Sequence, residues 1–120
     1  SGFADERFDG VTACFVMHEI PPRYVDRALE EFRRIIKPGG MLAFIEPSPI
    51  QLEASLASLL FSHGVKGLYF GFLARRLHEP FVRAWQKQQI GQKLAEYGFQ
   101  LLEDRDELPV RRILATRDAA

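Results

Sequence analysis

The sequence predicts an α/β fold in which a mostly parallel sheet of about four strands is flanked by helices. Two unbroken apolar runs, Val11–Met17 and Met41–Ile45, have the composition of strands buried on both faces. An amphipathic segment with helical spacing lies between them. Near the C-terminus, a charged turn joins two short strand-like segments, Phe99–Asp104 and Val110–Arg117, which predicts an antiparallel hairpin at a sheet edge.

The first helix is expected between the two apolar runs. Pro21 and Pro22 are tolerated before or within its first turn. Residues 37–40 (KPGG) are expected to end it, because proline cannot continue a helix and glycine allows a tight reversal. The order strand, helix, strand therefore predicts a βαβ unit with parallel strands. The expected buried face of this helix comprises Val25, Ala28, Leu29, Phe32, Ile35 and Ile36.

The segment 48–85 is expected to form a helical, aromatic-rich cap within a single domain that spans 1–120. Ile50–Phe61 has helical character, and the part from Leu73 to Trp85 is expected to be helical with a break near Pro80. The glycine-containing stretch GVKGLYFGF lies between them. The aromatic residues of this segment are Phe61, Tyr69, Phe70, Phe72, Phe81 and Trp85.

A final helix is expected from Gln86 onward. Ile90, Leu94 and Tyr97 recur with helical spacing, and Gly98 follows as a C-terminal cap. This helix precedes the predicted strand pair.

Composition is that of an ordinary globular domain, with 47% hydrophobic and 27% charged residues. The 16 basic residues balance the 16 acidic ones, so charge gives no indication of a nucleic-acid partner. Cys14 is the only cysteine, which excludes an internal disulfide and fits a cytoplasmic location. No membrane span is expected, because Gln51 and Glu53 interrupt the most apolar patch well before the roughly 20 residues that a span needs.

Three stretches resemble class I S-adenosylmethionine-dependent methyltransferases: FDGVTACFVMHEI, ALEEFRRIIKPGGMLAFIEP and QKLAEYGFQLLEDRDE. Together they cover nearly the whole chain and are similar to the C-terminal half of that family's Rossmann-like sheet. The family's glycine-rich loop and the acidic residue that holds the cofactor ribose have no counterpart in the sequence. The resemblance therefore implies a partial methyltransferase domain that is inactive alone and binds S-adenosylmethionine weakly.

The resemblance also implies a set of site residues. Ala13, Cys14 and Phe15 are expected to line the methionine portion of the cofactor. His18 is expected on the substrate side, where it accepts a proton from the nucleophile before methyl transfer. The other residues expected on the substrate side are Met17, Glu19, Glu46, Tyr69 and Phe72.

Structural interpretations of the same residues stay open. His18 and Glu19 would then be polar residues at a strand end, and Glu46 a boundary residue before Pro47. Cys14 is interpreted as a buried, inert thiol in the middle of a strand. No metal site is expected, because the histidines lack the spacing of known ligand motifs. These histidines are His18, His63 and His78.

The function implied by the resemblance is methyl transfer to a small, apolar molecule through an oxygen, nitrogen or carbon nucleophile. An alternative is a non-catalytic interaction module that forms a homodimer, or pairs with a complementary chain, through strand 11–17 or the aromatic segment. Half of a nicotinamide-dependent oxidoreductase is a third reading. The KPGG stretch and the terminal strand pair fit the methyltransferase pattern better than this last reading.

Overall fold

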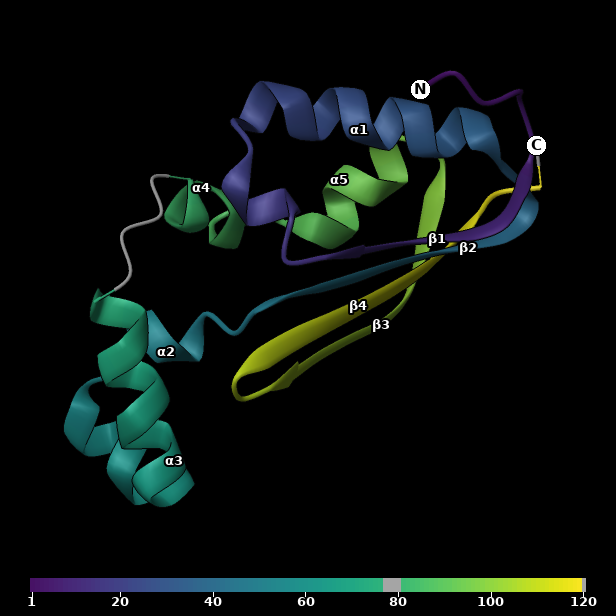
Figure 1. The fold of residues 1–120 in the computed structure, drawn as a ribbon. Coiled ribbons are helices and arrows are strands. Elements are labelled where there is room, and N and C mark those ends of the chain that lie inside the picture. The colour runs from purple at the N-terminus through teal and green to yellow at the C-terminus, as the bar shows by residue number, and fades with distance from the viewer. Residues whose placement is uncertain (77–80, 120) are drawn as a thin grey trace.

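The computed structural model of the chain describes residues 1–76 and 81–119 (Figure 1). Within them the strands are β1 (Phe8–Cys14), β2 (Ile36–Pro47), β3 (Phe99–Glu107) and β4 (Val110–Arg117). The helices are the 3₁₀ turn η1 (Met17–Glu19), α1 (Pro22–Ile35), α2 (Ile50–Glu53), α3 (Leu56–Arg76), α4 (Val82–Gln86) and α5 (Ile90–Glu96). The predicted break near Pro80 and the third histidine, His78, lie outside the described residues.

The described strands form one sheet in the order β1-β2-β4-β3. β1 and β2 are parallel, with Val11 opposite Leu42, and α1 connects them, which confirms the predicted βαβ unit. β3 and β4 form the predicted antiparallel hairpin. β4 also pairs antiparallel with β2, so the hairpin turns back into the sheet and β3 becomes its edge. The predicted α/β fold class is confirmed, but the expectation of a mostly parallel sheet is wrong: of the three pairings among the described strands, β1–β2 is parallel, and β2–β4 and β3–β4 are antiparallel.

The core lies between the sheet and the two helices α1 and α5, which sit on the same side of it (Figure 1). Leu29 of α1 and Leu94 of α5 are fully buried against Leu42 and Phe44 of β2. From Gly40 to Pro47, strand alternation places the even-numbered β2 residues on this covered face, whereas the odd-numbered residues such as Met41 and Ala43 are half-buried on the opposite face. The next even position after Phe44 is therefore also directed into the covered side.

The first strand differs from its prediction in position and burial. It ends at Cys14 rather than Met17, because Phe15 has a φ of 52° and the chain then turns into η1. β1 lies at the edge of the sheet, and Ala13 is its one buried residue. Cys14 points to the opposite face and is exposed, so its interpretation as a buried thiol is wrong.

The second strand begins earlier than predicted. α1 ends at Ile35, and the KPGG stretch already belongs to β2, which starts at Ile36. Gly39, with a φ of 78°, and a register shift between Phe8 and Gly10 of β1 allow the chain to bend here without leaving the sheet.

The helix α3 is two helical halves separated at Gly64, whose φ of 67° and ψ of −153° are accessible to glycine. The second half folds back on the first so closely that a Cβ at Gly67 would lie 2.4 Å from the carbonyl oxygen of Leu59. We call this hairpin, α2 and α4 the cap (residues 48–86); α2 and α3 stand away from the sheet in Figure 1. By length and its mean hydropathy of 1.2, α3 would pass as a membrane-spanning helix, but each half is shorter than the roughly 20 residues required.

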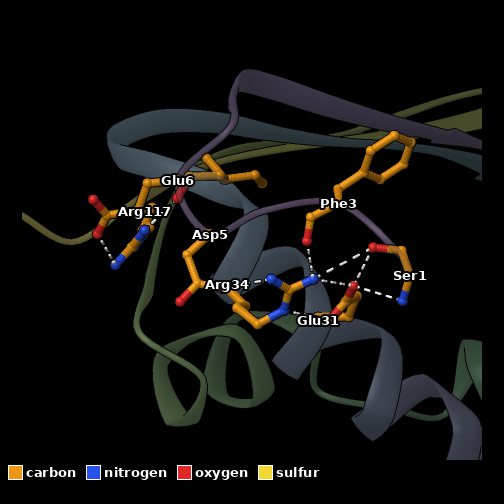
Figure 2. Close-up of polar contacts among 8 residues, drawn as sticks. Ser1, Phe3, Asp5, Glu6, Glu31, Arg34 and Arg117 are labelled. Carbon is orange, nitrogen blue, oxygen red and sulfur yellow. Dashed lines mark hydrogen bonds and ion pairs between the residues drawn. The ribbon is translucent and has the colours of Figure 1, made fainter.

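The N-terminal segment is fixed along α1 by Arg34 (Figure 2). The Arg34 guanidinium donates to Asp5 at 2.5 Å, to the carbonyl oxygen of Phe3 at 2.8 Å and to Glu31 at 2.7 Å. The hydrogen bond from Arg34 and the nearby terminal ammonium of Ser1 hold the pKa of the Glu31 carboxyl well below its usual range. These contacts define where the chain enters β1.

Candidate functional site

A mainly apolar cavity of about 260 Å³ lies between the ends of β1 and β2 and the cap. Its apolar lining comprises Phe15, Pro47, Phe70, Leu73, Ala74, Val82 and Pro109. Its polar lining comprises His18, Ser48, Gln51 and Gln86. Such a cavity, with few polar groups on apolar walls, is typical of a small-molecule site.

His18 and Glu46 form a buried pair at the wall of this cavity. Glu46 follows Phe44 by two positions on β2, so strand alternation directs its side chain into the covered face, where it is 0% exposed. The His18 ring is 2% exposed, and its Nδ1 lies 2.5 Å from Glu46 Oε2. The other carboxylate oxygen of Glu46 accepts the backbone N–H of Met17 at 3.0 Å. Both oxygens of the buried carboxylate are therefore engaged, as burial of a carboxylate requires.

The geometry defines which ring nitrogen of His18 can act on a substrate. A neutral ring that donates from Nδ1 to Glu46 carries its lone pair on Nε2. Nε2 lies 4.0 Å from Oε1 of Glu19, an exposed side chain, and the ring packs edge-on against Phe15 with centroids 6.2 Å apart. Glu46 thus holds the ring of His18, a residue of the cavity lining, in a fixed orientation.

The cap is joined to the hairpin turn at the base of the cavity. The backbone N–H of Ser48 donates to the carbonyl oxygen of Pro109 at 2.9 Å, and the Gln51 amide donates to the same oxygen at 2.5 Å. The Ser48 hydroxyl donates to Asp106 at 2.5 Å. Within the cap, Arg75 donates to the carbonyl oxygen of Gln51 at 2.7 Å, which satisfies an otherwise unpaired group of the short helix α2.

The structure brings together four of the residues expected from the sequence. Phe15 and His18 line the cavity, Met17 donates its N–H to Glu46, and Glu46 orients His18. Ala13 is buried in the hydrophobic core, whereas Cys14 is exposed.

Three expected residues lie elsewhere. Glu19 is exposed at the rim of η1, and Tyr69 and Phe72 are 60% and 52% exposed on the outer side of α3. The helical period instead directs Phe70, Leu73 and Ala74 of α3 to the cavity. Ser48, Gln51 and Gln86 had no signal in the sequence, because isolated polar residues in helical segments are typical of solvated faces. For Glu46 a signal existed: the alternation Leu42, Phe44, Glu46 along one face of β2.

The resemblance noted in the sequence places the methionine portion of S-adenosylmethionine at the end of β1. There Cys14 is exposed and Phe15 lines the cavity, so both residues are accessible to a bound molecule. Among residues 1–76 and 81–119, nothing corresponds to the glycine-rich loop or ribose-binding acid described above. In the same residues, no group of three or more His, Cys, Asp or Glu side chains is arranged to hold a metal ion.

Comparisons with known proteins agree with this architecture. A family model described as a methyltransferase domain matches residues 1–44. A demethylmenaquinone methyltransferase from Staphylococcus carnosus is 33% identical over 106 residues, which are 88% of this chain and 39% of that protein. A ubiquinone/menaquinone biosynthesis C-methyltransferase UbiE from Bartonella bacilliformis is 36% identical over 50 residues, which are 42% of this chain and 18% of that protein.

A solved structure gives the same result at the level of the fold. The DszA carbon methyltransferase superposes with a TM-score of 0.58 at 20% identity, covering 99% of this chain and 30% of that one. The chain thus spans less than half the length of each of these three proteins. The sheet, its covering helices and these matches define a Rossmann-like methyltransferase fold. More particularly, it is the class I S-adenosylmethionine-dependent methyltransferase fold, which confirms the resemblance noted in the sequence.

Proposed function

We propose that the full-length gene product transfers the methyl group of S-adenosylmethionine to a carbon atom of a small molecule, with His18 as the base. The observation that carries this proposal is the buried His18–Glu46 pair, with Nδ1 and Oε2 2.5 Å apart, at the wall of an apolar cavity. The printed names of UbiE and DszA, which both specify carbon methylation, support the choice of acceptor atom.

A base is needed because a carbon acceptor becomes nucleophilic only after it, or a conjugated hydroxyl group, loses a proton. His18 Nε2 takes this proton, and the Glu46 carboxylate stabilises the imidazolium that forms. Bound S-adenosylmethionine supplies the electrophilic methyl group. The cavity's apolar walls exclude water and so strengthen the attraction between the imidazolium and Glu46.

The walls also support a proposal about the acceptor. Apart from His18, no ionisable side chain is among the residues that line the cavity in the described part of the chain. A neutral, largely apolar molecule fits such a lining, since a charged one would lose its hydration without gaining a partner. The cap supplies much of the wall, through Phe70, Leu73 and Val82, and so would determine which acceptors fit.

The test is methyl transfer by the full-length gene product to two probes, acetoacetyl-N-acetylcysteamine and 1,4-naphthohydroquinone. We expect a product methylated at carbon, identified by nuclear magnetic resonance, and a turnover about 10²-fold or more lower in His18→Gln. His63→Gln, on the exposed part of α3, is the matched control and should retain the wild-type rate. Methylation at oxygen alone, or an unchanged rate in His18→Gln, would contradict the proposal.

A second candidate function is an interaction module, and exposed apolar residues of α3 favour it. Phe61 and Val65 are 90% and 77% exposed, and β1 presents an edge of the sheet. Such surfaces recruit partners or a second copy of the chain. Light scattering at high concentration tests this function: a concentration-dependent dimer that Phe61→Ser abolishes would support it, and a strictly monomeric chain would exclude self-association.

A further inference from the structure

Gln86, the last residue of α4, lies at the wall of the cavity that holds His18. Its amide nitrogen Nε2 is buried and has no hydrogen-bond partner within the described part of the chain. The remaining polar side chains of the lining are all engaged. His18 bonds to Glu46, the Ser48 hydroxyl to Asp106 and the Gln51 amide to Pro109. Gln86 is therefore the lining residue that keeps an unused donor.

An unused buried donor is unfavourable for the folded protein, because the amide has left water without gaining a partner. The neighbouring residue explains why Gln86 stays in place. Trp85 is 3% exposed and packs edge-on against Phe44 with ring centroids 5.8 Å apart, which anchors α4 to the core. α4 also packs near η1, the turn that carries His18. Gln86 is thus held at the wall by its helix.

We propose that Gln86 Nε2 donates a hydrogen bond to the oxygen atom conjugated with the acceptor carbon and so stabilises the enolate formed there. This inference rests on the proposed carbon methylation. When His18 Nε2 takes the proton, the C–H electron pair becomes the carbon–carbon double bond, and the carbonyl π pair moves onto oxygen. The enolate carbon then forms its bond to the methyl group, whose former bonding pair remains on the sulfur of the sulfonium donor.

The inference narrows the substrate class to neutral molecules that carry a carbonyl or hydroxyl oxygen beside the methylated carbon. An amide donor suits this oxygen, since it binds the neutral carbonyl weakly and the enolate more strongly. Donors of this kind contribute about 10²–10³-fold to turnover. Gln86 therefore acts mainly on kcat, whereas a residue that only shapes the cavity acts on KM.

The experiment compares Gln86→Leu and Gln86→Glu in the full-length gene product, with the two acceptor probes named above. Leu removes the donor, and Glu keeps the size of the side chain but places a carboxylate at the same point. We expect kcat to fall by about 10²-fold in both variants with KM changed less than about threefold. We also expect Gln86→Leu to unfold a few degrees higher than wild type, because the unused buried donor is gone.

Gln88→Leu is the matched control, since Gln88 also has a buried amide atom without a partner among the described residues but is absent from this cavity's lining. It should retain the wild-type kcat. If Gln86→Glu and Gln86→Leu keep kcat while His18→Gln loses it, the role of Gln86 is refuted and the proposed function stands. If His18→Gln keeps kcat as well, both are refuted.

Discussion

At the scale of one residue, Glu46 shows how this fold places a side chain of the candidate site. Its backbone belongs to β2, which is paired on both edges by β1 and β4, so its location is fixed from two sides. Its side chain is fully buried and bonds to His18 and to the backbone of Met17. Burying a carboxylate there is unfavourable for the free energy of folding unless the carboxylate is paired, and the His18 ring at the cavity is its partner.

We expect Glu46→Gln to lower the rate of methyl transfer by the full-length gene product about 10²-fold or more, because an amide cannot stabilise the imidazolium of His18 as a carboxylate does. The amide has the same size and its oxygen can still accept the Met17 N–H, so the fold should persist. The rate is measured in a single turnover, and circular dichroism checks the fold. Glu30→Gln, on the exposed face of α1, should behave as wild type. A Glu46→Gln rate within threefold of wild type would show that the carboxylate is not needed.

At the scale of elements, the cap depends on close packing between the two halves of α3. Leu59 is 1% exposed and lies under Gly67 and Gly71, where a Cβ would approach it to 2.4 Å in each case. The helical hairpin therefore exists because glycine occupies both positions. Its outer surface is left apolar and exposed, while its inner surface closes the cavity.

Gly67→Ala should destabilise the hairpin, because the new methyl group meets the backbone oxygen of Leu59 rather than a movable side chain. We expect a loss of about 1–3 kcal/mol, the range for overpacking a closely packed site. Hydrogen exchange of the α3 amides measures this loss locally. Gly91→Ala in α5 is the control: its methyl group would lie 3.2 Å from the end of the flexible Leu101 side chain, and stability should stay equal or rise. Equal protection of α3 in wild type and Gly67→Ala would contradict the packing argument.

The two helices that cover the sheet are linked by an ion pair between Asp26 of α1 and Lys93 of α5, 2.6 Å apart. The hydrogen bond from Lys93 lowers the pKa of Asp26 below its ordinary value of 3.8. A lowered pKa gives stability that is present above the unfolded pKa and is lost as pH falls through the folded one. Both side chains are partly exposed, so the pair contributes at most about 1 kcal/mol.

We therefore expect Asp26→Asn to unfold at lower temperature than wild type at pH 6, and the difference to disappear as pH falls below about 4. Thermal melts at several pH values measure the difference. Added salt should reduce it at pH 6, since exposed charges are screened. A difference that persists at pH 2 would mean that Asp26 acts through packing rather than charge.

At the scale of the whole molecule, the sequence was enough to predict the structural features that depend on local pattern. It was not enough to predict those that depend on contacts between residues far apart in the chain. The periodicity of residues 25–36 was enough to predict α1, and the pairing of two apolar runs gave the βαβ unit. The burial of β1 was not predictable, since it depends on which strand lies beside it and on what covers its outer face. The inner face of α3 was missed because the reversal at Gly64 resets the helical phase, so Phe70 rather than Tyr69 reaches the cavity.

Under the proposed function the chain would contribute one wall of the cofactor site at Cys14 and Phe15, so we expect it to bind S-adenosylmethionine with a Kd no tighter than about 1 mM. Without the glycine-rich loop, the cofactor would lose the close approach of the backbone that the glycines allow, and without the acidic residue it would lose its ribose partner. Isothermal titration calorimetry on the 120-residue chain measures the affinity. Submillimolar binding would mean that residues described here hold more of the cofactor than this wall.

The way in which the cap is attached has a consequence for how related proteins could differ in the acceptor they methylate. Glu46 lies near the end of β2, and the cap begins two residues later at Ser48. Under the proposed function, the residues that perform the chemistry, His18 and Glu46, therefore precede in the sequence the cap residues that select the acceptor. A chimaera that exchanges residues 48–85 of the cap would acquire another acceptor preference and would keep His18 and Glu46, together with Gln86, the last residue of the cap. The inserted segment would have to reproduce the contacts that attach the cap: those of Ser48 and Gln51 with Pro109, of Ser48 with Asp106, and of Trp85 with Phe44.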